Sequence, residues 1–390
     1  MTPSASQFLL SPKGREITAS ITGLSLDPLA LGSRLRKKYP DIEPANLAAV
    51  TELAETRVKA ANKFDRASDM FFTREALEQS TGEAVARHRA KRFQGLGHVL
   101  DACSGIGGDA IALAGMVDSL DCVDLDEGRL AFCGENCRIH GHENVGLIAR
   151  DVGEMIRVAA GYDAVFIDPS RRKGERRSSG LHVMEPPLEV MEALLRAAPR
   201  GAAKLSPSVR LDPLSIAHET EWIATADGLK EAVIWTGDFI RCETTVTLLH
   251  KNITLRDSDL PAAEPSIANA QDYIHEPDAA LIRSGLLGRK ASSLGMSLVS
   301  SEIAYMSSDA ATDDPFFTSY RIIESLPFNM KKLERLLNDR DIGRVTVKKR
   351  GFPMLPEEVK KKLKLRGKKE GIVILTKVKG NNTAFVVERV

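Results

Sequence analysis

The sequence has little net charge, few aromatic residues and few cysteines. Basic and acidic side chains number 54 and 53, a formal net charge of +1, and aromatic residues make up 5% of the 390 residues. The net charge alone therefore indicates no particular class of partner. The five cysteines do not form the even-numbered framework of a small cross-linked secreted protein, so we expect reduced thiols and a cytoplasmic location.

Long apolar runs are also absent. No stretch approaches the roughly 18–20 apolar residues of a membrane-spanning helix, and residues 1–17 lack the basic start and apolar run of a secretion signal. We therefore expect no membrane partner. With 43% hydrophobic and 27% charged residues, the composition is that of a globular protein, and the length predicts two or three domains.

The charge is distributed unevenly along the chain. Residues 331–390 contain 18 basic and 7 acidic side chains, a net charge of +11, so the first 330 residues carry −10. A basic C-terminal module on an acidic body favours binding of a polyanion, and a solvated lysine-rich surface is the open alternative. In this module Lys348, Lys349 and Arg350 precede Phe352, whose ring would either stack on a base or belong to the core.

Hydrophobic periodicity divides the chain into four parts. The first part carries apolar residues at three- and four-residue steps, which predicts helices. From residue 98, short apolar runs alternate with helical stretches, which is typical of a parallel, doubly wound α/β sheet with helices on both faces. We predict a helical region at 1–95, an α/β domain at 96–255, a polar linker at 256–279 and a small, basic α+β domain at 280–390.

The segment 99–109, Val-Leu-Asp-Ala-Cys-Ser-Gly-Ile-Gly-Gly-Asp, is the most informative of the chain. An apolar strand ends near Asp101, and a helix follows the turn. The turn itself contains Ser104, Gly105, Gly107 and Gly108. Glycines at such a place let the backbone approach a ligand closely. Taken alone, the turn also allows a Rossmann-like fold with a nicotinamide cofactor, although Ala110 departs from the Gly-x-Gly-x-x-Gly spacing.

Acidic residues also end the next three apolar strands. Asp124 follows the second strand, where a carboxylate can accept hydrogen bonds from both hydroxyls of a ribose. Asp151 follows the third strand, where it could accept from an adenine amino group. The fourth strand ends in Asp168-Pro169-Ser170-Arg171. The four strand ends lie about 20 to 30 residues apart, the spacing that βα units require.

With these features the chain resembles class I S-adenosylmethionine (SAM)-dependent methyltransferases, and most closely their trimethylguanosine-synthase-like branch. This resemblance covers roughly residues 65–253 and implies a Rossmann-like methyltransferase fold with SAM as cofactor. The implied cofactor residues are Asp101, Ser104, Gly105, Gly107, Gly108, Asp124 and Asp151. The implied catalytic residues, which position the acceptor, are Asp168, Pro169, Ser170 and Arg171. Residues from about 280 to 390 resemble the THUMP-like domain of a bacterial group of such proteins.

The fourth motif departs from the family pattern. Methyltransferases that act on amino groups carry a second proline and an aromatic residue after the Asp-Pro pair, where this chain has Ser170 and Arg171. The run is also similar to the Asp-Pro-x-Arg of RNA 5-methyluridine methyltransferases. Those enzymes need a cysteine nucleophile, and this chain has no cysteine between residues 138 and 241. We therefore do not expect carbon-5 chemistry by that route.

A basic cluster that includes Arg171, Arg172 and Lys173 adjoins this motif. Because arginine pairs with phosphate through two hydrogen bonds, the cluster favours contact with RNA, and a solvated loop is the alternative. With residues 348–350 it forms the predicted RNA-binding set. We predict a methyltransferase that acts on RNA. Methylation of a protein or small molecule, and RNA binding without catalysis, stay open as alternatives.

The close spacing of Cys133, Cys137, His140 and His142 invites comparison with a zinc site. Structural zinc sites usually add a second ligand pair further along the chain, which is missing here. The two cysteines are four residues apart on one predicted helix, where core positions recur. We therefore predict that they are core residues and that the protein holds no structural metal.

Overall fold

The computed structural model describes residues 3–21, 27–171, 181, 184–212 and 214–390. The chain forms two compact units, of which the first comprises Met1–Glu221 and Glu231–Arg241, and the second Trp222–Lys230 and Cys242–Val390. The helical region predicted at 1–95 therefore shares a unit with the first strands of the predicted α/β domain. Strands β8 (Glu219–Thr225) and β9 (Gly228–Gly237) contribute residues to both units. The predicted domain limits themselves stay a prediction.

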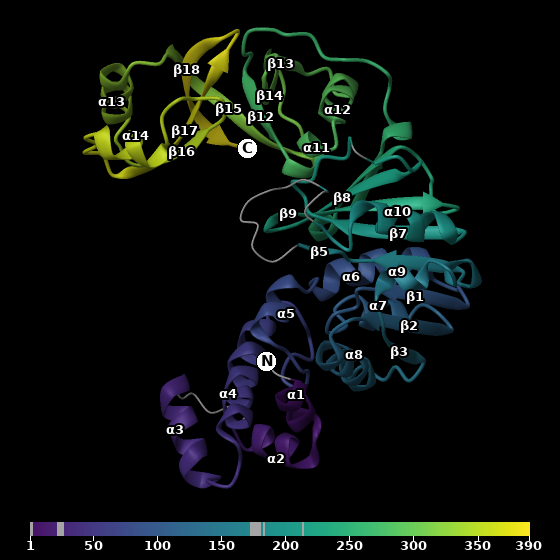
Figure 1. Ribbon diagram of the computed structural model, residues 1–390. Coiled ribbons are helices and arrows are strands. Elements are labelled where there is room, and N and C mark those ends of the chain that lie inside the picture. Colours follow the sequence, from purple (N-terminus) through teal and green to yellow (C-terminus); the bar gives the residue numbers. More distant parts are fainter. Residues whose placement is uncertain (1–2, 22–26, 172–180, 182–183, 213) are drawn as a thin grey trace. The chain divides into compact units, whose positions relative to one another are not determined.

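Helices build the N-terminal part of the first unit (Figure 1). They are α1 (Pro3–Leu10), α2 (Pro12–Ile21), α3 (Pro28–Lys38), α4 (Pro44–Ala60), α5 (Arg74–Gln79), α6 (Glu83–Ala90) and the 3-10 turn η1 (Lys91–Phe93). The first four helices all begin at a proline, whose fixed φ and missing N–H suit the first turn of a helix. Leu9, Ile17 and Leu53 are fully buried, and α1 packs against both α4 and α8 (Glu127–Ile139).

A parallel sheet forms the rest of the first unit. Its strands are β1 (His98–Ala102), β2 (Ser119–Asp124), β3 (Val145–Ala149), β4 (Ala164–Ile167), β7 (Arg200–Leu205) and part of β9. They lie in the order β3-β2-β1-β4-β7-β9, and all are parallel except β9, which runs antiparallel to β7. The strand order reverses between β1 and β4, which is where open α/β sheets bind ligands. The predicted doubly wound α/β sheet is confirmed.

Helices cover both faces of this sheet. They are α7 (Ala110–Ala114), α8, α9 (Val152–Met155) and α10 (Leu188–Ala197), with the 3-10 turn η2 (Ala159–Gly161) before β4. Helix α7 contacts α8, and α9 contacts α10. Since βαβ crossovers are right-handed, the reversal of strand order puts these two pairs on opposite faces. Val99, Leu100 and Phe166 are fully buried between them. After β4, a short hairpin pairs β5 (Ser170–Arg171) with β6 (Met184–Glu185).

The second unit is mainly β-structure. The antiparallel pair β10 (Thr244–Leu248) and β11 (Ile253–Arg256) precedes a seven-stranded sheet in the order β13-β14-β12-β15-β18-β17-β16. The seven strands are β12 (Tyr273–Pro277), β13 (Ser297–Ser300), β14 (Ile303–Ser308), β15 (Phe317–Pro327), β16 (Ile342–Lys349), β17 (Lys369–Val378) and β18 (Asn381–Arg389). Strand β12 belongs to the segment predicted as a linker, and it pairs with β14 and β15.

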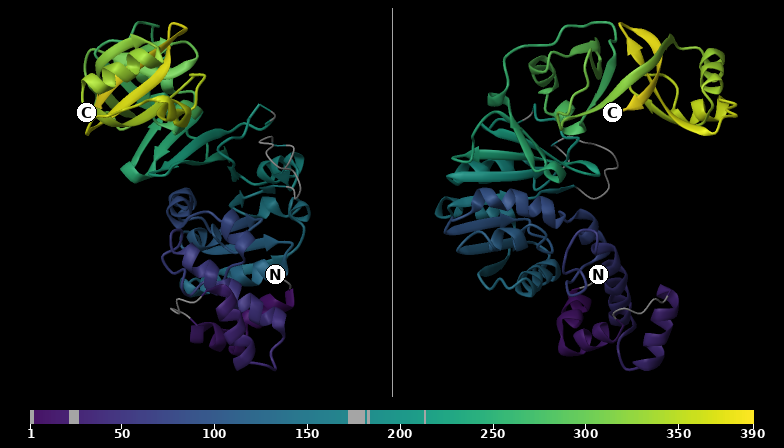
Figure 2. Two further views of the ribbon diagram at one scale, coloured as in Figure 1. Left: turned by 90° about the vertical axis from the view of Figure 1, so that its left-hand side faces the viewer. Right: turned by 180° about the vertical axis from the view of Figure 1, so that it is seen from behind.

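Short helices complete the second unit. They are η4 (Leu249–Lys251), η5 (Asp257–Asp259), α11 (Ala279–Arg283), α12 (Leu287–Ser293), α13 (Met330–Asp339) and α14 (Pro356–Lys362). Helices α13 and α14 lie along the C-terminal strands (Figure 2), where Leu333, Leu337 and Val359 pack on the buried side chains of β16, β17 and β18. These helices and strands form the α+β structure that was predicted for the C-terminal part of the chain. Among the helices of the described residues, none is long and apolar enough to span a membrane.

Candidate active site at the carboxyl ends of the strands

Four carboxylates meet at the carboxyl edge of the parallel sheet. Asp101 lies in β1, Asp124 ends β2, Asp151 follows β3 by two residues, and Asp168 directly follows β4. Burial raises the pKa of the Cys103 thiol well above its usual value, and the charges of all four carboxylates raise it further. The strand ends identified from the sequence therefore lie along one edge of the sheet, the edge where parallel sheets bind their ligands.

The glycine-rich turn after β1 is held by its neighbours in a tight conformation. Gly105 and Gly107 have φ angles of 56° and 88°, in the left-handed region that glycine adopts without strain. The Asp124 carboxylate accepts a hydrogen bond of 2.9 Å from the backbone N–H of Gly105. A Cβ atom on Gly107 would lie only 3.2 Å from the Cα atom of Cys133, so α8 packs directly on the turn. Ser104 is buried, and Gly108 precedes the N-cap of α7.

Asp101 has a fully buried carboxylate that forms no hydrogen bond within the described part of the chain. Its side chain is 0% exposed, and neither carboxylate oxygen has a hydrogen-bond partner among the described residues. Burial raises the pKa of Asp101 well above its usual value, and the nearby charge of Asp109 adds to this effect. A buried polar group without partners costs free energy. Asp101 is therefore well placed to accept hydrogen bonds from a ligand.

A buried ionic network that includes Arg89 and Asp109 lies near Asp101. The Arg89 guanidinium is 2% exposed and forms ion pairs with Asp109 at the start of α7 and with Glu231 in β9. Thr81 donates a hydrogen bond of 2.9 Å to the second oxygen of Asp109. The Arg89 guanidinium carbon also lies 4.9 Å from the ring centroid of Phe166 in β4. Arg89 thus joins α6, the glycine-rich turn and two strands of the sheet.

Asp168 is paired with a lysine from the neighbouring strand. The Lys204 ammonium in β7 donates a hydrogen bond to the Asp168 carboxylate. Burial raises the pKa of Asp168, and the positive charge of Lys204 opposes that rise. Burial lowers the pKa of Lys204, but the charges of Asp168 and Asp109 outweigh it and the net pKa is raised. The Asp168 side chain is 24% exposed, so the pair can reach a substrate at the sheet edge.

The other residues predicted for this site have different surroundings. Asp151 caps α9, because its carboxylate accepts a hydrogen bond of 2.7 Å from the N–H of Gly153, and it is exposed. Pro169 follows Asp168, and Ser170 is exposed and opposite Glu185 in the β5–β6 hairpin. The side chain of Arg171, and the whole of Arg172 and Lys173, lie outside the described residues. The roles assigned to these residues stay predictions.

The predicted RNA-binding residues of the second unit make contacts within the protein. The Lys348 ammonium lies 2.5 Å from a carboxylate oxygen of Glu276. Lys349 donates to the carbonyl of Phe352 at 3.2 Å, and Arg350 donates to the carbonyl of Ala304 at 2.7 Å. Phe352 is 4% exposed and belongs to the core around α13 and α14. Phe352 is therefore a core residue in the structure and does not present its ring for stacking on a base.

Cys133 and Cys137 are fully buried on α8, as predicted from their spacing. Across the residues that the structure describes, no group of three or more His, Cys, Asp or Glu side chains could hold a metal ion. The expectation of a protein without a structural metal stays a prediction.

Three charged residues of this site escaped the sequence analysis. Arg89, Lys204 and Glu231 are buried or nearly so, and each pairs with a charged partner distant in the sequence. For Lys204 the signal was a single charged residue within an apolar stretch, in the run Ala-Ala-Lys-Leu that ends β7, whereas Arg89 and Glu231 stand near other charged residues. Such a residue is almost never fully buried unless it is paired, so it predicts an ionic partner, although it does not identify that partner.

The chemistry of these residues fits SAM. The cluster combines the acids Asp101, Asp109, Asp168 and Glu231 with the bases Arg89 and Lys204. Acids therefore outnumber bases in a buried site, which favours a cationic ligand. SAM carries an ammonium group that can donate hydrogen bonds to a carboxylate such as Asp101, and a positively charged sulfonium. The partnerless oxygens of Asp101 are the specific feature of this structure that such a ligand would satisfy.

Comparison with known proteins points to the same chemistry. Residues 96–171 match a family model described as RNA cap guanine-N2 methyltransferase, and residues 317–389 match a THUMP domain-like model. Two proteins from Mycobacterium tuberculosis strains CDC 1551 and H37Rv, named as uncharacterized S-adenosylmethionine-dependent methyltransferases, are 29% identical over 326 residues, 82% of this chain and 88% of theirs.

A solved structure shares the fold. The crystal structure of a candidate methyltransferase from Porphyromonas gingivalis W83 has a TM-score of 0.77 and 20% sequence identity, and the match covers 93% of this chain and 98% of the other. Together with the family models, these similarities confirm the resemblance to SAM-dependent methyltransferases and to the THUMP-like domain.

Proposed function

We propose that this SAM-dependent methyltransferase, which carries a THUMP-like domain, transfers its methyl group to RNA. The observation that carries the proposal is the placement of four carboxylates at the edge of the sheet that holds the glycine-rich turn, with Asp101 buried and without partners among the described residues. Two family models support RNA as the substrate, since one describes RNA cap methyltransferases and the other a THUMP-like domain. The net charge of +11 on residues 331–390 also favours a polyanion.

In this proposal three carboxylates hold the cofactor. Asp101 accepts hydrogen bonds from the ammonium of the methionyl part, Asp124 from the ribose hydroxyls and Asp151 from the adenine amino group. Ser104 and the turn glycines at 105, 107 and 108 bring the backbone close to the ligand. SAM supplies an activated methyl group on its sulfonium. Asp124 also holds Gly105, so it shapes the turn as well as accepting from the ligand.

Asp168 orients the acceptor. Its carboxylate lies at the sheet edge and accepts a hydrogen bond from an N–H or O–H group of the RNA, which aligns that group for transfer. The positive charge of the Lys204 ammonium, which donates a hydrogen bond to this carboxylate, opposes the rise that burial produces in its pKa. Pro169, Ser170 and Arg171 form the adjacent wall of the acceptor site. Because no aromatic residue follows Pro169, we expect the acceptor to be held by polar contacts more than by stacking on this motif.

Nucleoside analysis tests the proposal. RNA from cells with and without the gene is digested to nucleosides and compared by mass spectrometry. The purified protein is then incubated with the unmodified RNA and SAM carrying a labelled methyl group. We expect one methylated nucleoside that is lost in the deletion strain and restored in vitro by the native protein, whereas the Asp168→Ala variant fails to restore it. Label found only on a protein or a small molecule would reject RNA as the substrate.

A further inference from the structure

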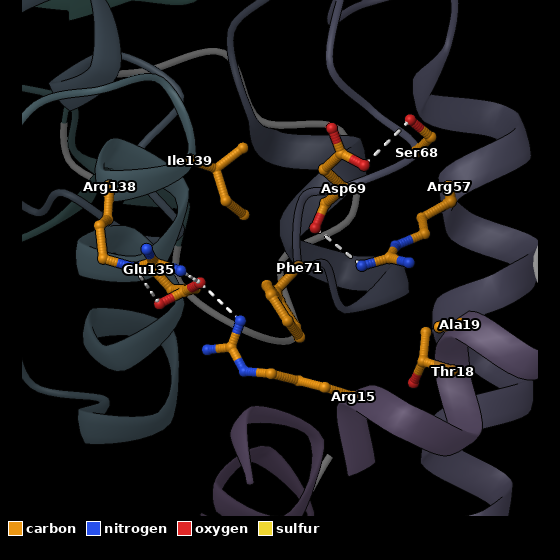
Figure 3. Close-up of a pocket in the computed structure, with 10 residues that line it drawn as sticks. All are labelled: Arg15, Thr18, Ala19, Arg57, Ser68, Asp69, Phe71, Glu135, Arg138 and Ile139. Atoms are coloured by element: carbon orange, nitrogen blue, oxygen red, sulfur yellow. Dashed lines mark hydrogen bonds and ion pairs between the residues drawn. The ribbon is translucent and has the colours of Figure 1, made fainter. Parts of the chain in front are cut away.

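A pocket lies in the first unit, and its lining includes none of the four strand ends. It has a volume of about 390 Å³ and lies between α2, α4, the segment after α4 and the C-terminal end of α8 (Figure 3). Three arginines, Arg15, Arg57 and Arg138, line it together with Phe71, Glu135 and Asp69. None of these residues has a part in the proposed cofactor or acceptor site, so the concentration of guanidinium groups needs its own explanation.

Two of the arginines stack on Phe71, a residue that is only 3% exposed. The guanidinium carbons of Arg15 and Arg57 lie 5.2 and 5.4 Å from the centroid of its ring. A ring attracts cations to its face, and this attraction holds the two groups in place in spite of their like charges. Figure 3 shows both side chains directed toward Phe71 from different helices, Arg15 from α2 and Arg57 from α4.

The acidic residues of the pocket do not balance this positive charge. Glu135 serves two arginines, with its carboxylate 2.7 Å from Arg15 and 2.6 Å from Arg138. Burial acts to raise the pKa of Glu135, but the hydrogen bonds from Arg138 and Arg15 outweigh it and lower the pKa to about 2. The second acid, Asp69, forms an ion pair with Arg66 at 3.1 Å. Three guanidinium groups thus pair with two carboxylates, and within the described residues Arg57 pairs with neither.

Within the described residues, Arg57 is paired with main-chain carbonyls and with no carboxylate. Its Nε and Nη2 atoms donate to the main-chain carbonyls of Met70 and Asp69, each at 2.8 Å, and no ion pair to it exists among the described residues. Burial, helped by the charge of Arg15 and opposed by that of Asp69, lowers the pKa of Arg57 to about 10. A guanidinium that has lost much of its water without gaining a counter-ion attracts an anion strongly.

One buried side chain joins this pocket to the glycine-rich turn. Asn136 of α8 is fully buried, and its amide exchanges two hydrogen bonds, of 2.8 and 3.0 Å, with the backbone of Phe71. The same amide donates at 2.9 Å to the carbonyl of Ile106, which lies between the turn glycines. The aromatic wall of the pocket and the proposed cofactor turn are therefore held in a fixed relation to each other.

We propose that this pocket binds a phosphate group of the RNA substrate. The inference rests on RNA being the substrate, as proposed above. Guanidinium groups bind phosphate through paired, charge-assisted hydrogen bonds, and 390 Å³ is at the lower end of the range for small-molecule sites, enough for one nucleotide phosphate. The N-terminal helices then anchor the RNA at a fixed offset from the methyl-transfer site. A free phosphate compound offers the same chemistry, so the experiment separates the two sources.

Charge variants of the full chain test this site. Binding of a labelled single-stranded RNA is measured over a salt series for the native protein, Arg57→Gln, Arg138→Gln and the control Arg36→Gln, which removes an exposed charge from α3 outside the pocket. We expect roughly tenfold weaker binding for Arg57→Gln and a smaller loss for Arg138→Gln. For each, the slope of log affinity against log salt should fall by about 0.7. The control should stay within about twofold.

Glu135→Gln separates a binding role from a structural one, because it removes a negative charge and leaves an oxygen that can still accept hydrogen bonds. Bound phosphate predicts equal or tighter RNA binding for this variant, whereas a merely structural role predicts a loss like that of Arg57→Gln. Normal RNA binding by both arginine variants would overturn the site and leave the proposed function intact. If RNA does not bind but inorganic phosphate raises the melting temperature of the native protein and not of Arg57→Gln, the site holds a free phosphate, and RNA as the substrate fails separately.

Discussion

At the scale of single residues, we expect Asp101 to lower the stability of the unliganded protein and to strengthen SAM binding. The Asp101→Asn variant keeps the shape of the side chain and removes a buried ionisable group that lacks partners among the described residues. We expect it to melt at a higher temperature than the native protein when no ligand is present, by roughly 2–4 °C for each kcal/mol gained. The same change should weaken SAM binding by tenfold or more, which calorimetry measures. A variant that melts lower and binds SAM normally would contradict both expectations.

The sign of this stability difference depends on pH. Below about pH 3.9, the ordinary pKa of Asp, the carboxyl is neutral in the folded and the unfolded chain, so the two proteins should be equally stable. As pH rises, the unfolded chain ionises first, because burial raises the pKa of Asp101 in the folded state. The native protein therefore loses stability relative to Asp101→Asn as pH increases toward the raised pKa. Melting curves from pH 4 to 8 should show the gap widening with pH.

Asp124 should affect SAM binding both directly and through the shape of the glycine-rich turn. Its carboxylate is predicted to accept from the ribose, and in the structure it accepts from the N–H groups of Gly105 and Asp126, both at 2.9 Å. Asp124→Ala should weaken SAM binding by about 1.5–3 kcal/mol, or roughly 10- to 150-fold in calorimetry, because a charged acceptor is lost. Asp227→Ala, an exposed change in the turn before β9, serves as the control and should leave SAM affinity unchanged. Tight nicotinamide binding without SAM binding would contradict the cofactor assignment.

Lys204 should act as a positioning residue through Asp168. Its positive charge counteracts the rise that burial produces in the pKa of Asp168. In Lys204→Gln that pKa should rise further, so the acid limb of the profile of kcat against pH should move to higher pH. Activity should then recover in part when the pH is raised, with SAM affinity within about tenfold of the native value, or roughly 1.4 kcal/mol. A uniform loss of kcat at every pH would indicate that Lys204 has another role.

At the scale of elements, Arg89 ties helix α6 to the sheet. Arg89→Met leaves the buried carboxylates of Asp109 and Glu231 without their partner, which should cost about 3–5 kcal/mol of stability. Thermal unfolding should show a large fall in melting temperature, whereas Lys91→Met, an exposed change directly after the same helix, should change it little. Adding Glu231→Gln to Arg89→Met should restore part of the loss, since contacting residues are not additive. Additive losses would argue against a shared network.

The sequence predicts the elements of the site better than their connections. Alternating apolar runs and helices predict the doubly wound sheet. Because the strands are parallel, the strand-end residues Asp101, Asp124 and Asp168 must then lie at the same edge of that sheet. The partners of Arg89 could not be predicted in this way, because Asp109 and Glu231 lie 20 and 142 residues away along the chain. Pairings over such distances depend on the packed tertiary structure, which local periodicity does not describe.

Local charge was a weaker guide in the C-terminal module. The run Lys348 to Arg350 is as basic as any in the chain, yet these side chains contact Glu276 and two main-chain carbonyls. A count of charges does not tell on which face of a strand a residue lies, and β16 alternates between its two faces. Three exposed lysines at the end of α14 and just after it form no ion pair within the described residues. They are Lys361, Lys362 and Lys364.

At the scale of the whole molecule, the difference in charge between residues 1–330 and residues 331–390 is tested by salt dependence. If the basic residues neutralise RNA phosphates, each contact contributes a slope of about −0.7 to log affinity against log salt on a single strand. The triple variant Lys361→Gln, Lys362→Gln and Lys364→Gln should therefore weaken RNA binding and reduce the slope by about 2 in filter binding. SAM affinity should not change, since these residues lie outside the methyltransferase match at 96–171. Lys348→Gln breaks an internal ion pair, so it should lower the melting temperature and leave the slope of log affinity against log salt nearly unchanged. If the triple variant keeps the native affinity and slope, these lysines only solvate the surface, and the RNA contacts lie elsewhere.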